Sequence, residues 1–410
     1  QFSIPPIFSP MDTIEFLKPL IRQTDSKIIF FVCDGLGGLP GDDGRTELET
    51  ANTPNMDELA SRSELGQLIP VLPGITPGSG PGHLGLFGYD PIKYQIGRGV
   101  LSALGVNFDI QPGDLGVRMN FASLDADGNV TDRRAGRIPT EENVRLLELL
   151  GDIELPGVEL FLETEKEYRA ILIIRGEGLS EALTDSDPQV TGVPPRQIEP
   201  LKLEAEKSAE LLKEFAAQVR ERLKDESPAN MVLMRGYAVY RPYPTFEDVY
   251  GLKAAAIAAY PMYRGLGKLV GMDIYAVEGS LKEEVDQLEE VWNDHNFFFI
   301  HFKYTDSTGE DGDFAGKVAR TEEADQVVPR LLALNPDVLA ITGDHSTPSK
   351  LMSHSWHPIP LLLHSSLART KKVDGFGETE CSMGTLGTLR SKELLPLLLA
   401  HAGKLEKFGG

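Results

Sequence analysis

The sequence predicts an α/β fold with a central sheet of mostly parallel strands and a smaller inserted α+β segment. Three short apolar runs favour this class, and an aspartate follows closely after each; they cover residues 28–33, 297–303 and 337–342. Continuous apolar runs of this length are typical of parallel strands that are buried on both faces. Because the carboxyl ends of parallel strands lie on one edge of a sheet, we expect the three aspartates to meet there.

The middle of the chain has a different pattern of predicted secondary structure. Short strand-like stretches alternate there with one helical stretch; the strands are expected at 115–121, 158–162 and 169–174, and the helix near 141–150. We therefore predict an inserted cap domain over residues 115–185 and a core built from residues 20–114 and 186–410. Further helices are expected in the core, at 54–66, 202–225 and 281–291. Residues 1–10 are expected to lie outside the fold.

Composition and charge indicate which classes of molecule the chain is expected to bind. The 410 residues are 41% hydrophobic, which allows a large buried core, and they carry 40 basic against 62 acidic side chains, a formal net charge of −22. So acidic a chain is not expected to bind nucleic acid or an anionic membrane, and an anionic substrate would need a local basic pocket. No apolar run reaches membrane-spanning length, and residues 1–10 show no signal-peptide pattern.

Cysteine usage indicates the compartment. The two cysteines, Cys33 and Cys381, are too few for a disulfide framework, so a reducing cytoplasm is expected. The sequence leaves the oligomeric state open, with a homo-oligomer as one alternative.

A glycine-rich turn presents a candidate nucleophile. Ser79 stands among turn-forming residues and precedes an apolar run; the neighbours are Gly78, Gly80, Pro81 and Gly82. This pattern predicts a tight turn that leads into a helix N-terminus, where a serine is exposed and anions are favoured. No base stands beside Ser79, so its activation must come from elsewhere in the fold. The alternative is an ordinary loop in which the serine only caps a helix.

Residues 132–137 contain three arginines, Arg133, Arg134 and Arg137, around a glycine. In an acidic protein such a cluster suits bidentate capture of a phosphate or a carboxylate. A solvated basic loop is the alternative interpretation.

Acidic and histidine residues at the predicted strand ends could form a metal centre. Carboxylates of Asp34, Asp306 and Asp344, with the imidazoles of His345 and His354, make a donor set suited to two divalent cations. Two such cations could clamp a phosphoryl group and convert the hydroxyl of the turn serine into an alkoxide. The metal centre would thus supply the activation that the turn lacks.

Taken together, these motifs resemble those of archaeal-type, cofactor-independent phosphoglycerate mutases, which belong to the alkaline phosphatase superfamily. The resemblance extends nearly end to end, from Ile28 to Gly409, and its motifs are an aspartate–glycine pair at 34–35, the serine turn at 79–83, Arg-Ala-Gly-Arg at 134–137 and Gly-Asp-His-Ser-Thr-Pro at 343–348. It implies an alkaline-phosphatase-like core with a cap, a phosphoserine intermediate and two divalent ions. Manganese, cobalt or magnesium would be the expected ions, with zinc as a further alternative.

The resemblance also implies ligand sets. One ion would take Asp34, Ser79, Asp344 and His345; the other would take Asp306, Glu310 and His354. The chain departs from the family pattern at two of these motifs. Glu310 stands where the family usually has a histidine, and His357 stands where it has an aspartate. Glu310 can still bind a metal as a harder, charged ligand, and His357 could replace the lost imidazole or support the site from behind.

Substrate residues follow from the same resemblance. Arg134 and Arg137 match the family's Arg-x-x-Arg pattern, and further candidates for the same pocket are Arg133, Arg264, Lys303 and His83. For the histidine, bracing of the serine turn is the favoured role. The implied reaction is interconversion of 3-phosphoglycerate and 2-phosphoglycerate. A metal-dependent phosphatase or phosphotransferase acting on another small phosphorylated acid is the alternative enzyme, and a binding protein that lost catalysis at Glu310 is the non-enzymatic alternative.

Overall fold

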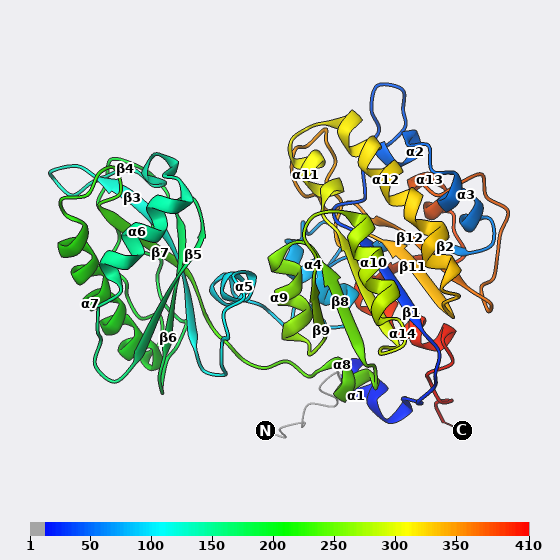
Figure 1. The fold of residues 1–410 in the computed structure, drawn as a ribbon, viewed down its shortest axis with the longest axis horizontal. Helices are drawn as coiled ribbons and strands as arrows, with labels where there is room; N and C mark the ends of the chain where they lie inside the picture. Colours follow the sequence, from blue (N-terminus) through cyan, green and yellow to red (C-terminus); the bar gives the residue numbers. More distant parts are fainter. Residues whose placement is uncertain (1–12, 410) are drawn as a thin grey trace, which may run out of the picture. The chain divides into compact units, whose positions relative to one another are not determined.

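A computed structural model describes residues 13–409 of the chain, so the predicted extension at 1–10 lies outside the described residues (Figure 1). The chain forms two compact units. Unit 1 contains the described residues up to Gln95 and again from Tyr243, and unit 2 consists of Ile96–Pro242. No helix of the described part is both long enough and apolar enough to cross a membrane.

Unit 1 is organised around an eight-stranded sheet. Its strand order is β13-β2-β12-β11-β1-β10-β8-β9. The strands are β1 (Ile28–Cys33), β2 (Glu64–Ile69), β8 (Ala254–Ala258), β9 (Asp273–Ala276), β10 (Phe297–Phe302), β11 (Val338–Thr342), β12 (Ile359–Ser365) and β13 (Gly387–Arg390). Only β12 runs antiparallel to its neighbours among these strands. The prediction of a mostly parallel central sheet is therefore confirmed.

The three predicted apolar strands are adjacent at the centre of this sheet. β1 pairs in parallel with β10, with Cys33 opposite Phe302, and with β11, with Val32 opposite Thr342. All residues of the three strands are buried, which explains why their sequences show no polar alternation. Because their last residues lie level with one another, the segments that follow all begin at the same edge.

Helices cover both faces of the sheet. Apolar side chains of α10 and α12 belong to the same buried core cluster as Ile29 and Phe31 on one face of the sheet. Phe87, just after α4, contacts Phe299 on the other face, at 5.0 Å between ring centroids. α10 begins with a capping box in which Ser280 and Glu283 satisfy each other's backbone N–H groups. The α-helices of unit 1 are α1 (Thr13–Leu17), α2 (Glu47–Thr50), α3 (Pro54–Ala60), α4 (Ser79–Leu86), α8 (Phe246–Tyr250), α9 (Pro261–Leu269), α10 (Leu281–Val291), α11 (Tyr304–Glu310), α12 (Phe314–Ala333), α13 (Glu378–Ser382) and α14 (Leu394–His401).

Unit 2 contains a separate five-stranded antiparallel sheet, in the order β4-β3-β6-β5 with β7 also paired to β3. Its strands are β3 (Leu115–Leu124), β4 (Val130–Asp132), β5 (Glu159–Lys166), β6 (Arg169–Arg175) and β7 (Met231–Val239). Its α-helices are α5 (Arg98–Gly105), α6 (Thr140–Leu150) and α7 (Glu206–Leu223). The predicted strands and helix between residues 115 and 185 are all present.

The predicted limits of the insertion, 115–185, are too narrow. β7 pairs along β3 from Leu115, opposite Val239, to Ala122, opposite Met231. The apolar stripe of α7, which includes Phe215, belongs to the same core cluster as β3. The helix predicted at 202–225 and the strand after it therefore belong to unit 2 and not to the core, because they complete the sheet that residues 115–175 begin.

Candidate active site

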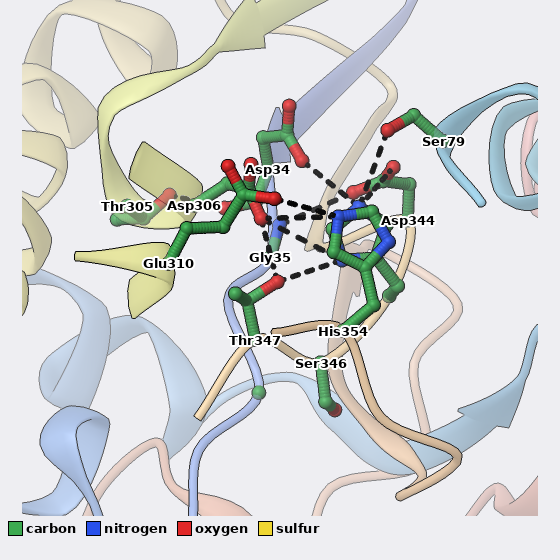
Figure 2. Close-up of polar contacts among 12 residues, drawn as sticks. Asp34, Gly35, Ser79, Thr305, Asp306, Glu310, Asp344, Ser346, Thr347 and His354 are labelled. Atoms are coloured by element: carbon green, nitrogen blue, oxygen red, sulfur yellow. Dashed lines mark hydrogen bonds and ion pairs between the residues drawn. The ribbon is translucent and has the colours of Figure 1, made fainter. Parts of the chain in front are cut away.

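Residues from four separate segments meet at the carboxyl edge of the central sheet of unit 1. Asp34 follows β1, Asp306 lies in α11 directly after β10, and Asp344 with His345 follows β11. His354 lies in the loop before β12. Figure 2 shows the side chains of Asp34, Asp306, Asp344 and His354 pointing toward one another. The sheet thus brings together the residues that the sequence placed at strand ends.

The first donor group consists of Asp34, Asp344 and His345, each of which is completely buried. The Nε2 of His345 lies 3.3 Å from Asp34 Oδ1 and 3.1 Å from Asp344 Oδ2. Both carboxylate oxygens are buried, and neither accepts a hydrogen bond within the described residues. A buried, unpaired carboxylate oxygen is costly unless a cation satisfies it. Two such oxygens beside an imidazole nitrogen fit a divalent metal ion.

A second donor group consists of Asp306, His345 and His354. Asp306 Oδ1 lies 3.6 Å from His354 Nε2 and 3.9 Å from His345 Nδ1. The two imidazole rings are stacked, with their centroids 3.6 Å apart. Burial lowers the pKa of His345, although nearby carboxylates oppose this. The neutral imidazole is the form that binds metals, so this environment suits a ligand. A neutral imidazole has only one unprotonated ring nitrogen, so His345 can bind an ion of one group and not of both.

His354 is oriented by the serine turn. Its Nδ1 donates a hydrogen bond to the carbonyl oxygen of Pro77 at 3.0 Å. The Nε2 atom is therefore the nitrogen left to face Asp306. This contact links the second donor group to the loop that carries the candidate nucleophile.

Ser79 is the first residue of α4, as the glycine-rich turn predicts. Its Oγ lies 3.5 Å from the Nε2 of His345, at the edge of the first donor group. Gly82, one turn further on, packs so closely that a Cβ atom there would lie 2.6 Å from the carbonyl oxygen of Asp344. Any larger residue at position 82 would push the helix, and Ser79 with it, away from the carboxylates.

His83 braces this turn from inside. It is completely buried, and its Nδ1 lies 2.9 Å from the carbonyl oxygen of Ser79 and 3.2 Å from Asp344 Oδ2. A side chain with no exposed surface cannot contact a substrate directly in this arrangement. The structure thus agrees with the bracing role and disagrees with the substrate-binding role of His83.

Lys303 neutralises the carboxylates from one side. Its Nζ lies 3.1 Å from Asp34 Oδ2 and 2.5 Å from Asp306 Oδ2, and the hydroxyl of Tyr263 also donates to Asp34 Oδ2. Burial alone would raise the pKa of Asp34, but Lys303 together with the nearby imidazoles of His301 and His345 holds it well below the usual value. The pKa of Lys303 is raised, because the two carboxylates outweigh its burial. Asp34 is therefore ionised and Lys303 protonated.

The arginine cluster lies in unit 2, on the short 3₁₀ turn Ala135–Arg137. Asp132 closes this turn by accepting hydrogen bonds from the backbone N–H groups of Arg134 and Gly136. The side chains of Arg134 and Arg137 are exposed and make no side-chain ion pair or hydrogen bond with any described residue. Both guanidinium groups are therefore available for an anion.

Arg133 differs from its two neighbours. Its Nε and Nη2 each donate at 2.7 Å to Asp187, which is completely buried. This bidentate pair commits the guanidinium of Arg133 to the interior of unit 2, so the structure does not support the prediction that it binds substrate. Arg264 follows Tyr263 on α9 and is half-buried, with no ion pair inside the described range.

Comparison with known proteins identifies the family. The family model of 2,3-bisphosphoglycerate-independent phosphoglycerate mutase matches residues 60–230. A probable 2,3-bisphosphoglycerate-independent phosphoglycerate mutase from Thermus thermophilus is 52% identical over 405 residues, which cover 97% of this chain and 100% of that protein. This chain belongs to the same family. The resemblance predicted from the motifs is thereby confirmed.

Further relatives of this mutase family agree. A Thermotoga maritima protein of the same name is 50% identical over 400 residues, covering 97% of this chain and 99% of that one. The solved cofactor-independent phosphoglycerate mutase from Thermoplasma acidophilum has a TM-score of 0.73 and 29% identity, over 92% of this chain and 100% of that one. A solved Pyrococcus horikoshii protein has a TM-score of 0.80 and 32% identity, over 95% and 100% of the two chains.

The two departures from the mutase pattern, Glu310 and His357, belong to neither donor group. Glu310 Oε1 is 3.6 Å from His354 Nε2, but the Glu310 side chain is 53% exposed and belongs to neither group of converging donors (Figure 2). His357 stacks on Trp356, and its Nδ1 lies 3.1 Å from the Ser355 hydroxyl. His357 therefore does not replace the missing imidazole within the site as it stands.

Thr347 and Tyr263 belong to the site but were not among the predicted residues. Thr347 contacts Asp306 and His345, and Tyr263 contacts Asp34. Thr347 lies within the Gly-Asp-His-Ser-Thr-Pro motif, so the sequence could have predicted that it belongs to the site. Tyr263 comes from a helix far away in sequence, where nothing marks it.

Proposed function

We propose that this chain interconverts 3-phosphoglycerate and 2-phosphoglycerate through a phosphoserine at Ser79, with two divalent ions. The observation that carries the proposal is the position of the Ser79 Oγ, 3.5 Å from His345 Nε2, where two groups of carboxylate and imidazole donors converge. Membership of the mutase family supports the choice of substrate. Ser79 also begins α4, and the partial positive charge at a helix N-terminus favours a phosphorylated serine.

Each of the two ions would have its own set of ligands. Asp34, Asp344 and His345, with the Ser79 oxygen, would hold one ion, and Asp306, His354 and Glu310 would hold the other. When bound, such ions lower the pKa of a serine hydroxyl and neutralise the phosphoryl oxygens. Manganese, cobalt or magnesium suits this oxygen-rich donor set, and zinc is an alternative.

The proposed chemistry has two mirrored halves. The Ser79 oxygen forms a bond to phosphorus as the bond from phosphorus to the glycerate oxygen breaks, and that glycerate oxygen takes up the proton that the serine released. The glycerate then reorients. Its other hydroxyl attacks the phosphoserine and releases its proton, and Ser79 regains a proton as its bond to phosphorus breaks. Arg134 and Arg137 would hold the glycerate between the halves, and exclusion of water prevents net hydrolysis.

A cytoplasmic location is part of the proposal. Cys33 and Cys381 are free and buried, and burial raises the pKa of both thiols. Such thiols suit a reducing compartment in which no disulfide is needed.

Phosphorus NMR of one reaction mixture tests the proposal. The chain is incubated with 3-phosphoglycerate and Mn²⁺, and the expected result is a growing 2-phosphoglycerate signal with little inorganic phosphate. Ser79→Ala should show neither product, while it keeps its fold. Release of inorganic phosphate without 2-phosphoglycerate would favour the phosphatase alternative, and metal binding without any turnover would favour a binding protein.

A further inference from the structure

A buried lysine lies directly behind the candidate metal centre. Lys317, on α12, has no exposed surface, and its Nζ donates three hydrogen bonds to backbone carbonyl oxygens. The acceptors are Gly35 at 2.8 Å, Gly37 at 3.0 Å and Thr347 at 2.8 Å. All three protons of the ammonium are therefore used, and all three acceptors belong to loops that carry candidate ligands.

These carbonyls join the two halves of the donor set. Gly35 directly follows Asp34, and Thr347 lies two residues after His345 and donates its hydroxyl to Asp306. One ammonium group thus ties the loop after β1 to the loop after β11. Three carbonyl oxygens that converge on one point would repel one another without a cation between them.

The loops are packed too tightly to adjust independently. Gly35 has a φ of +64°, and a Cβ atom there would lie 2.5 Å from Thr347 Oγ1 and 2.9 Å from Asp306 Oδ1. The N–H of Thr347 donates back to the carbonyl oxygens of Gly35 at 3.2 Å and Gly37 at 3.0 Å. Loss of the ammonium would therefore shift the ligand residues, because the loops are packed too tightly to rearrange without moving them.

Two acids near Lys317, Glu47 and Glu378, favour its charged form. The carboxylate of Glu47 is completely buried, with one oxygen bound to the N–H and hydroxyl of Ser349 and the other without a hydrogen-bond partner in the described part. Glu378 accepts hydrogen bonds from the Gly38 N–H and the Thr46 hydroxyl. Desolvation disfavours a buried ammonium and lowers the pKa of Lys317, and the nearby acids offset only part of that cost.

We propose that Lys317 is a positioning residue of the metal centre: its ammonium holds the two ligand-bearing loops in register and thereby sets the affinity for divalent ions. It touches neither substrate nor ion. The inference rests on the proposed function, because it requires that the two donor groups bind metal.

A second buried lysine provides a matched control. Lys404 is 1% exposed, and its Nζ donates to the carbonyl oxygen and the hydroxyl of Thr24 at 2.8 and 3.1 Å. Thr24 precedes β1, so this lysine lies at the opposite end of the strand from Asp34. Lys404→Met removes a buried ammonium from the same unit without touching the loops of the site.

The experiment measures Mn²⁺ affinity by calorimetry and metal-free unfolding by denaturant, for the parent, Lys317→Met and Lys404→Met. Both variants should unfold more easily without metal. Only Lys317→Met should bind Mn²⁺ more weakly, by roughly ten- to hundredfold, the range seen when groups that support metal ligands are removed. Excess Mn²⁺ should restore phosphoserine formation in Lys317→Met.

Two outcomes separate this inference from the proposed function. A Lys317→Met affinity within about twofold of the parent would overturn the inference alone, as would an equal loss of affinity in Lys404→Met. A parent chain that binds no Mn²⁺ would overturn the metal centre itself. If Lys317→Met does not fold, Lys317→Gln, which keeps two N–H donors without the charge, is judged by the same comparison.

Discussion

The hydroxyl of Thr347 donates a hydrogen bond of 2.6 Å to Asp306 Oδ1 and lies 2.9 Å from the Nδ1 of His345. A hydroxyl has one proton, and an ionised carboxylate can only accept. The Thr347 oxygen must therefore accept from His345, which places the imidazole proton on Nδ1. The lone pair of Nε2 is left pointing at Asp34 and Asp344, as a metal ligand requires.

Removing this hydroxyl should weaken metal binding. Thr347 is completely buried, so Thr347→Val keeps the volume while it leaves His345 without a partner for its Nδ1–H. We expect Mn²⁺ affinity to fall by roughly ten- to hundredfold, measured by calorimetry. Thr347→Ser, which keeps the hydroxyl, should bind within a few-fold of the parent. Equal affinities in the valine and serine variants would contradict the tautomer argument.

Glu310 is expected to tune which ion the second donor group prefers. Glu310→His should keep activity and shift preference from Mg²⁺ and Mn²⁺ toward softer ions such as Co²⁺ and Zn²⁺, because imidazole is a softer ligand than carboxylate. Glu310→Ala should weaken the second Mn²⁺ by about tenfold or more.

The neighbouring acid Asp311 supplies the control for Glu310. It is exposed, and its side chain makes no hydrogen bond or ion pair among the described residues. Asp311→Ala therefore removes the same charge without removing a candidate ligand. Equal Mn²⁺ affinities in Glu310→Ala and Asp311→Ala would show that Glu310 acts only through its charge.

The central sheet and its strand-end carboxylates could be predicted because the signals are local. Each of the three apolar strands is buried on both faces, so its sequence alone indicates its place in the sheet, and the parallel arrangement then brings Asp34, Asp306 and Asp344 to one edge. The serine turn could also be predicted, because three glycines lie close together in the sequence, at Gly78, Gly80 and Gly82.

Contacts between distant segments could not be predicted in this way. β7 pairs with β3 about a hundred residues earlier, so the true limits of unit 2 depend on a pairing that no local pattern encodes. Lys317 lies in a helix that also carries exposed charges such as Arg320, and its burial follows only from where α12 packs. The sequence does not distinguish Arg133 from Arg134 and Arg137, because its partner Asp187 lies 54 residues away along the chain.

Glu284 should make stability depend on pH. Its side chain on α10 is buried, with one oxygen accepting the N–H of Ala259 at 3.2 Å and the other without a hydrogen-bond partner in the described residues. Burial raises the pKa of Glu284 well above its usual value. In the unfolded chain this carboxyl ionises near its ordinary pKa of about 4.3, while the folded chain retains the proton to higher pH. The free energy of unfolding therefore falls as pH rises between these two pKa values.

A glutamine cannot ionise, so Glu284→Gln should remove this fall in the free energy of unfolding with rising pH. Its stability relative to the parent should increase from about pH 4 upward, as measured by urea denaturation across pH in the presence of a chelator. Glu290→Gln, an exposed change on the same helix, is the control for the loss of a surface carboxylate. A flat difference for Glu284→Gln would contradict the assigned shift.

The last prediction separates two arginines four positions apart. Arg137 is exposed and has no side-chain partner among the described residues, whereas Arg133 is paired with the buried Asp187. Arg137→Ala should leave unfolding unchanged, yet remove one charged contact to the glycerate, typically on the order of 1.5–3 kcal/mol or roughly ten- to hundredfold in transition-state binding. The phosphoserine should still form, but more glycerate should escape before the return step. The ratio of inorganic phosphate to 2-phosphoglycerate should therefore rise as mutase flux falls.

Arg133→Ala should behave in the opposite way. It leaves the Asp187 carboxylate buried without its bidentate partner, so unit 2 should lose on the order of 3 kcal/mol of stability. While the chain remains folded, the product ratio should stay close to that of the parent. Both products are measured in one tube, with a denaturation curve for each variant. An unchanged product ratio in Arg137→Ala would assign that arginine to a solvated loop, because an arginine that holds the intermediate cannot be removed without letting some of it escape to water.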